Sequence, residues 1–217
     1  MDTPDLPRSV GVLGVGRFGG ALARHARGAG LAVEVAGSAD DPAAACACDV
    51  VILAIPLARY RALPAGLLRG ALVVDAMNHW WEVDGARPEF DDPRTSTSET
   101  VQAFLRESRV VKAFGHASAW EVENLPHPAG HPDRRGIAIA GDDARDTAVV
   151  AALVDALGFD PVLAGPLAAG VAFEPGTEIF GSDATAAELR EMLARFPESQ
   201  RGRVVARARH GREGGAR

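Results

Sequence analysis

The sequence predicts an α/β fold, a doubly wound parallel sheet (a Rossmann-type arrangement) with a small C-terminal α/β extension. Apolar runs typical of buried strands alternate with helical patterns along the chain, and an early strand leads through a glycine-rich turn into a helix. With 217 residues, 47% of them hydrophobic, the chain can bury one sizeable core. We expect one domain over residues 1–200 and a disordered Arg- and Gly-rich tail over 201–217.

The expected elements of the first half follow from apolar runs and their boundaries. Gly30 is placed to end the first helix, and Pro56 closes the third strand. We expect strands at about 9–13, 31–36, 50–55 and 71–76, a helix over 17–29, one helical turn over 43–48 and a helix over 57–69.

In the second half, Ser96 and Glu99 have the spacing of a capping box and predict a helix that ends near Arg106. Residues 77–96 read as a polar, aromatic loop, and residues 115–135 as a long loop with three prolines. We expect strands at about 109–114, 136–140 and 158–163, and helices over 143–157 and 185–193.

The glycine turn Gly14-Val15-Gly16-Arg17-Phe18-Gly19 follows the first strand and opens the first helix. In that context the G-x-G-x-x-G pattern indicates dinucleotide binding. Gly14 permits the tight turn, Gly16 lets a diphosphate approach the backbone, and Gly19 lets the helix pack closely on the strand. The unpaired N–H groups of the first helical turn then face the phosphates. The alternative is an ordinary strand–helix turn.

The end of the second strand favours NADP over NAD. Ser38 stands at the position where NAD-binding proteins usually have an acid for the ribose hydroxyls, about twenty residues beyond the glycine turn. Asp40 and Asp41 follow and would repel a phosphate, whereas Arg17 could contact it with its guanidinium. NADP is therefore the expected cofactor, with NAD as the alternative.

Other candidate residues lie where further strands end, the edge at which ligands bind in such sheets. Ala54, Ile55, Pro56 and Met77 are expected to line the dinucleotide. The candidate catalytic residues are Asn78, Trp80, Lys112 and His116. Asn78 could bond the nicotinamide ribose or carboxamide, and Trp80 or the neighbouring Trp81 could stack on a flat ring. Lys112 could contact substrate or phosphate, and His116 could donate a proton. Each also has a plain structural interpretation as a turn, core or surface residue.

Composition excludes several other classes of function. A net charge of −6 argues against nucleic acid as a partner, and no apolar stretch is long enough to span a membrane. Cys46 and Cys48 are too close for a disulfide, and no histidine lies near them at zinc-site spacing, so we expect no metal. The N-terminal segment lacks the features of a signal peptide, which predicts a cytoplasmic location. No G-x-S-x-G motif is present, and hydride transfer needs no nucleophile.

Several segments resemble those of the coenzyme F420-dependent NADP oxidoreductases. The similar segments are the glycine turn and residues 49–56, 73–78, 110–114 and 140–143, and the most specific similarity is over 157–167 with 174–177. The resemblance covers about residues 9–203. It implies a Rossmann domain, a homodimer and hydride transfer between NADPH and oxidised F420 or a related small-molecule acceptor. It implies cofactor contacts for Gly14, Gly16, Arg17, Phe18, Gly19, Ser38, Ile55, Pro56 and Asn78.

Three departures from that family define the alternatives. Ala39 replaces a common arginine, Gly115 replaces an asparagine, and the link 38–49 is too short for the family's extra strand and helix. These departures favour the alternative of a non-catalytic NAD(P)-binding module. An imine reductase is a third alternative, which shares only the N-terminal half.

Overall fold

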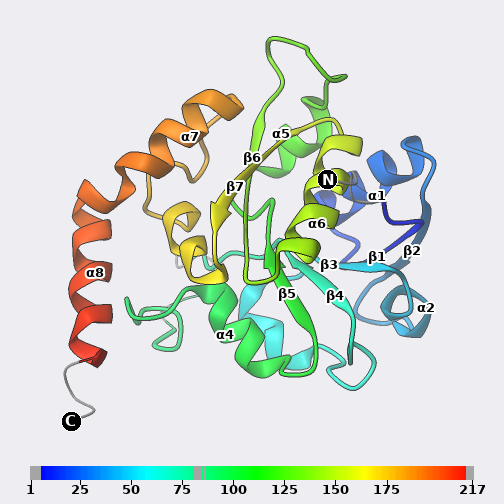
Figure 1. Ribbon diagram of the computed structural model, residues 1–217. Coiled ribbons are helices and arrows are strands. Elements are labelled where there is room, and N and C mark those ends of the chain that lie inside the picture. Colours follow the sequence, from blue (N-terminus) through cyan, green and yellow to red (C-terminus); the bar gives the residue numbers. More distant parts are fainter. Residues whose placement is uncertain (1–5, 81–84, 86, 214–217) are drawn as a thin grey trace.

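A computed structural model describes residues 6–80, 85 and 87–213 (Figure 1). The strands are β1 (Ser9–Leu13), β2 (Ala32–Ala36), β3 (Val50–Leu53), β4 (Leu72–Asp75), β5 (Arg109–Lys112), β6 (Gly136–Gly141) and β7 (Asp160–Gly165). The α-helices are α1 (Arg17–Gly28), α2 (Ala43–Cys46), α4 (Thr97–Phe104), α5 (Ala119–Asn124), α6 (Ala144–Ala156), α7 (Ala186–Arg195) and α8 (Gln200–Glu213). Short 3-10 helices are η1 (Leu57–Ala62), η2 (Leu167–Phe173) and η3 (Phe196–Glu198).

The strands form one seven-stranded sheet in the order β2-β1-β3-β4-β5-β6-β7. The predicted α/β class is confirmed, with one correction to its parallel character. The first five strands of this order are parallel, β6 runs antiparallel to β5, and β7 runs parallel to β6. The chain reaches β6 from α5 through the loop 125–135 rather than through a crossover helix, so β6 returns in the opposite direction.

Two apolar cores cover the two faces of the sheet. Alternate residues of the strands, such as Val50 and Ile52 of β3, pack with α1, α5 and α6 on one face. The residues between them, such as Val51 and Leu53, pack with α2, η1 and α4 on the other face. A third cluster joins β6 and β7 to η2 and α7. Because both faces are covered, these strands read in the sequence as continuous apolar runs.

The short link after β2 leaves that strand at the edge of the sheet. Only β1 pairs with β2 among the described strands, so the extra strand of the resembled family has no counterpart there. The short link can connect β2 to β3 because its helix α2 packs directly against β1. A Cβ at Gly11 would stand 1.9 Å from the Ala45 carbonyl oxygen, so only glycine permits this approach.

Two expected segments differ in the structure. The helix expected over 57–69 is the 3-10 helix η1, because Pro64 offers no N–H and its preceding residue Leu63 is extended. Helix α5 falls within the expected loop 115–135. Ser118 and Glu121 form its capping box, the same signal that correctly predicted α4 from Ser96 and Glu99.

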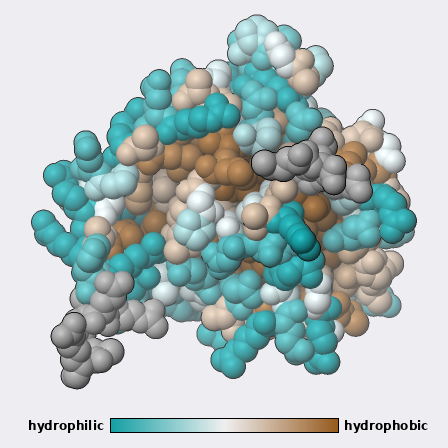
Figure 2. Space-filling model, viewed as in Figure 1, coloured by the Kyte–Doolittle hydropathy of each residue, from teal (hydrophilic) through white to brown (hydrophobic). Residues whose placement is uncertain are grey.

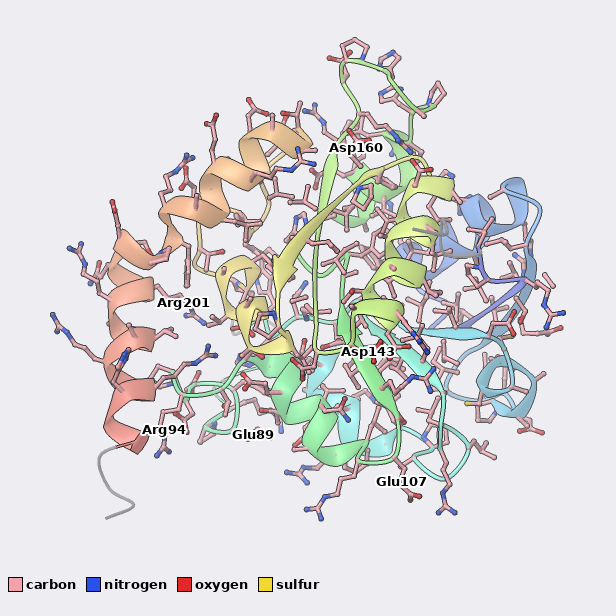
Figure 3. The ribbon with its side chains drawn as sticks, viewed as in Figure 1. Glu89, Arg94, Glu107, Asp143, Asp160 and Arg201 are labelled. Atoms are coloured by element: carbon pink, nitrogen blue, oxygen red, sulfur yellow. The ribbon has the colours of Figure 1, made fainter. Side chains whose placement is uncertain are left out.

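The third difference is α8, which spans residues 200–213 and so occupies most of the segment 201–217 that was expected to be a disordered tail. Arg201, labelled in Figure 3, donates to the buried carboxylate of Glu174 at 3.1 Å. Arg209 donates to the carbonyl oxygens of Ala168 and Arg94 at 3.1 and 3.2 Å, and Arg94 lies beside the far end of α8 in Figure 3. The arginines that suggested a solvated tail therefore attach the helix. Residues 214–217 lie outside the described part of the chain.

The surface is mainly hydrophilic in the view of Figure 2, with an apolar area between α6 and α7. Leu163 of the edge strand β7 is 64% exposed. Within the described ranges, none of the helices has both the length and the apolar character that crossing a membrane requires.

Candidate functional site

The glycine turn has the geometry expected of a phosphate-binding turn. Gly14 has φ +120°, and a Cβ there would stand 2.3 Å from the Ala54 carbonyl oxygen. A Cβ at Gly19 would lie 2.1 Å from the Gly14 carbonyl oxygen, whereas one at Gly16 would meet nothing within 4 Å. Gly14 and Gly19 are therefore needed for the turn and its packing, and Gly16 leaves open space beside the backbone.

The first turn of α1 is suited to an anion. Its N-cap, Gly16, has no side chain to accept from the first N–H groups, and no acidic residue lies in that turn. The N–H groups and the positive end of the helix dipole are thus available to a phosphate.

Two pockets flank Ile55 and Pro56, which follow β3 and line both. The first, here called the adenosine pocket, has a volume of about 280 Å³ and lies between the end of β2 and η1. It is lined by Leu13, Gly14, Ala36, Gly37, Ser38, Asp40, Pro42, Ile55, Pro56, Arg59, Ala62, Leu63 and Pro64.

The second, here called the ring pocket, has a volume of about 500 Å³. It is lined by Phe18, Ala54, Ile55, Pro56, Ala76, Met77, Asn78, Trp80, His116, Ala117, Ser118, Ala119, Phe180 and Gly181. The structure thus brings together three of the four candidate catalytic residues, Asn78, Trp80 and His116. No Asp, Glu, Lys or Arg occurs among these described lining residues.

Asn78 is oriented by the loop that follows β5. Its Nδ2 donates a hydrogen bond to the Gly115 carbonyl oxygen at 2.8 Å. The amide oxygen Oδ1 is the remaining acceptor of that side chain. Glycine suits position 115, because a Cβ would stand 2.9 Å from Lys112 Cε and 3.0 Å from the Met77 carbonyl oxygen, so that these groups would have to shift. Gly115, where the resembled family has an asparagine, therefore leaves room for the side chain of Lys112.

Lys112 does not line the ring pocket in the described structure. It is 1% exposed, and its ammonium lies 3.4 Å from Oδ2 of Asp75, which is fully buried. Lys112 Nζ also donates to the Met77 carbonyl oxygen. Asp75 accepts from the Met77 N–H at 3.0 Å and from the Ser98 hydroxyl at 2.6 Å. This buried network holds the backbone of Met77 at the pocket, which makes Lys112 a positioning residue.

His116 is buried at the wall of the ring pocket, with 3% of its surface exposed. Its Nε2 lies 3.0 Å from the backbone N–H of Ala138 and accepts from it, so a neutral ring carries its proton on Nδ1. Burial, reinforced by the positive charge of Lys112, lowers the pKa of His116 to about 4. Nδ1 has no hydrogen-bond partner among the described residues. His116 is therefore a neutral hydrogen-bond donor at neutral pH, not a cationic acid.

The backbone that leads to His116 is strained. Phe114 has φ +64°, a left-handed conformation that is rare for a bulky side chain. Its ring is fully buried and packs edge-on to Phe159 at 6.1 Å between centroids. Such conformations cost about 1–3 kcal/mol and persist where the surroundings impose them, often at functional sites.

Aromatic side chains form the mouth of the ring pocket. Trp80 and Phe180 have ring centroids 5.5 Å apart, and both line the pocket. Sequence reasoning missed Phe180, since it follows η2 far along the chain and lies in no recognised motif. The Gly181 N–H donates to the His116 carbonyl oxygen at 2.9 Å and brings this segment to the site. Trp81 lies outside the described residues.

The other predicted cofactor residues divide between the two pockets. Ser38 lines the adenosine pocket, and Phe18, Ala54 and Met77 line the ring pocket. Val15, an exposed residue of the glycine turn, lines neither of them.

The structure holds Arg17 on α5 rather than at the adenosine pocket. Its Nε donates to Oε2 of Glu123 at 2.7 Å, and Arg24 binds Oε1 of the same carboxylate at 3.0 Å. These hydrogen bonds help to lower the pKa of Glu123. Arg59, which does line the adenosine pocket, was not predicted.

Among the described residues, no three His, Cys, Asp or Glu side chains gather in a way that could hold a metal ion. The arrangement is instead one continuous edge at the carboxyl ends of β1, β3 and β4, with a phosphate turn between two pockets. That edge is where this type of sheet binds a dinucleotide.

Comparison with solved structures identifies the fold. The chain is similar to a hypothetical protein from Sinorhizobium meliloti, with a TM-score of 0.66 and 26% identity over 82% of this chain and 93% of the other. It is also similar to a protein from Arthrobacter sp. FB24 described as an F420-dependent NADP reductase, with a TM-score of 0.61 and 22% identity over 74% and 86% of the two chains. The chain has a Rossmann fold.

The same Rossmann fold occurs in the 3-hydroxyisobutyrate dehydrogenase of Mycobacterium tuberculosis, with a TM-score of 0.55 and 15% identity over 76% of this chain and 57% of that one. No protein-family model matches the chain, and no curated protein is similar to it in sequence. The resemblance expected from the sequence is thus confirmed at the level of the fold.

Proposed function

We propose that this protein is an NADP-dependent oxidoreductase that transfers a hydride between NADP(H) and a flat acceptor, coenzyme F420 or a related ring. The observation that carries the proposal is the pair of pockets that meet at Ile55 and Pro56, with the glycine turn beside them. An extended dinucleotide would place its adenosine in one pocket and its nicotinamide in the other.

The residues present fit such a cofactor. Gly16 leaves room for a diphosphate, and the uncapped first turn of α1 offers it N–H groups. When bound, NADPH supplies the hydride, and the protein provides binding and orientation. Pro56 and Ile55 form the apolar wall against which the cofactor would turn from one pocket into the other.

The polar groups of the ring pocket have separate tasks in this proposal. The Oδ1 atom of Asn78 accepts from a carboxamide or ribose hydroxyl, while its Nδ2 stays on Gly115. His116 contributes a neutral ring to the pocket wall, and its buried Nδ1–H has no partner among the described residues. The proton that accompanies the hydride comes from solvent, because His116 is neutral at neutral pH.

Aromatic walls and the lack of charged lining residues favour a flat, uncharged ring as the acceptor. Trp80, Phe180 and Phe18 can stack on such a ring. A hydroxy-acid substrate would need a cation for its carboxylate, and the described lining residues provide none. The sequence resemblance and the Arthrobacter structure support a deazaflavin of the F420 type.

The alternative is an NAD(P)-binding module without catalysis. The shortened link after β2, which leaves that strand at the edge of the sheet beside the adenosine pocket, favours this alternative. We further propose that the protein is a homodimer, as the resemblance implies, and that it acts in the cytoplasm. Sedimentation of the purified protein would test the homodimer.

The test is an anaerobic fluorescence titration with NADPH, NADH and F420, followed by turnover with a panel of deazaflavins, flavins, cyclic imines and hydroxy acids. The proposal predicts NADPH binding and its oxidation by deazaflavins. Binding without turnover across the panel would favour the module, and turnover of imines alone would favour an imine reductase.

A further inference from the structure

The adenosine pocket contains one positive and one negative side chain. Arg59 of η1 and Asp40 of the turn after β2 both line it, and no other described lining residue is charged. The remaining wall is mostly apolar, and Ser38 adds a hydroxyl at the tip of β2. Arg59 and Asp40 are therefore the two charged groups that a bound cofactor would meet in this pocket.

Arg59 is an exposed residue, and its guanidinium has no hydrogen bond or ion pair within the described part of the chain. Two other arginines, the nearby Arg61 and Arg17 of the glycine turn, already have partners. The Arg61 guanidinium stacks over the Tyr60 ring at 5.0 Å, and Arg17 is bound to Glu123. A guanidinium that is free to form a fork-like contact suits a phosphate group.

Asp40 acts in the opposite sense. Its Oδ2 accepts from the Gly37 N–H at 2.8 Å, which fixes the carboxylate in the turn after β2. A carboxylate at this end of the second strand accepts from ribose hydroxyls in NAD-binding proteins and repels a 2′-phosphate. Asp40 therefore favours NAD at the pocket where Arg59 favours NADP.

We propose that Arg59 binds the 2′-phosphate of NADP and that the opposition of Arg59 and Asp40 sets the preference between NADP and NAD. This inference rests on the proposed function, whose cofactor it specifies. It assigns the phosphate contact to η1, after β3, instead of to the end of β2, where the resembled family has an arginine and this chain has Ala39. The contact compensates for the shortened link, because η1 forms the wall opposite β2.

The test uses probes without a nicotinamide ring, so that it does not depend on hydride transfer. Binding of 2′,5′-ADP and of 5′-ADP is measured by calorimetry for the wild type, Arg59→Gln, Asp40→Asn and Arg61→Gln. We expect Arg59→Gln to lower the affinity for 2′,5′-ADP by about tenfold or more and the affinity for 5′-ADP by less than about twofold. Asp40→Asn should strengthen 2′,5′-ADP, and the matched control Arg61→Gln should leave both affinities unchanged.

The inference is overturned if Arg59→Gln weakens both probes equally or neither of them. It is also overturned if Arg17→Gln, and not Arg59→Gln, causes the selective loss. Thermal melting of each variant confirms that it is folded. Selective loss in Arg59→Gln without turnover by the wild type would support the inference while rejecting the proposed oxidoreductase activity, so the two failures are distinguishable.

Discussion

The two pockets that meet at Ile55 and Pro56 are built in different ways. The ring pocket rests on the core, where Lys112 and Asp75 are buried and His116 is held by a strand N–H. The adenosine pocket is formed by surface segments, with an exposed arginine and a turn aspartate. We therefore expect changes in the buried wall of the ring pocket to affect stability and function together, and changes at the adenosine pocket to affect only the choice of cofactor.

The strongest test of this contrast is Lys112→Met. It leaves the fully buried carboxylate of Asp75 without its cation, and removal of one partner of a buried ion pair costs about 3–5 kcal/mol. Denaturant unfolding should show that loss, and the double variant Lys112→Met/Asp75→Asn should recover part of it. A Lys112→Met protein as stable as the wild type would remove the distinction between the two pockets.

The buried His116 makes the stability of the protein depend on pH, which is a second test of this contrast. Its pKa falls from 6.5 to about 4 on folding, so the unfolded chain takes up the proton first as the pH decreases. The contribution of His116 to the free energy of unfolding is fully present above pH 6.5. It is lost progressively as the pH falls toward 4, by about 3 kcal/mol in total. Unfolding of the wild type should therefore depend more steeply on pH in this window than that of His116→Gln. Equal slopes would contradict a buried neutral ring.

The glycine turn lies between the two pockets and should separate binding from folding. A Cβ at Gly16 meets nothing within 4 Å, so Gly16→Ala should leave the melting temperature unchanged. The added methyl group would contact the diphosphate, so the affinity for NADPH should fall by about tenfold or more. Gly20→Ala is the matched control, since its Cβ is also unobstructed and it lies inside α1. If both variants bind NADPH like the wild type, the turn does not hold the phosphates.

The smallest expected effect belongs to the aromatic mouth. Trp80→Ala and Phe180→Ala should each raise the KM for a flat acceptor by about two- to tenfold, which corresponds to an aromatic contact of about 0.5–1.5 kcal/mol. Steady-state kinetics at saturating NADPH measures the effect, and the Kd for NADPH should stay the same. A change in that Kd with no change in KM would place the acceptor elsewhere.

The sequence predicted the elements whose signals are local. The glycine turn, the capping box at Ser96 and the buried strands were correctly placed. The antiparallel β6 was not predicted, because strand direction depends on how a long loop returns. Helix α8 was not predicted either, since its arginines bind partners such as Glu174 that are distant in the sequence.

The same limit applies to the site. The residues at strand ends, Asn78 and His116, could be selected because parallel strands end at one edge. Phe180 and Arg59 could not, because each reaches its pocket from a segment without a motif. Lys112 looked available in the sequence, and only the packing reveals that it is buried on Asp75.

The most direct test of the central claim is anaerobic oxidation of NADPH with two acceptors, F420 and 5-deazariboflavin, which has a related ring without the anionic tail. Because no described lining residue of the ring pocket is charged, both acceptors should be reduced with kcat/KM values within about tenfold of each other. Tight NADPH binding without oxidation by either acceptor would contradict the claim.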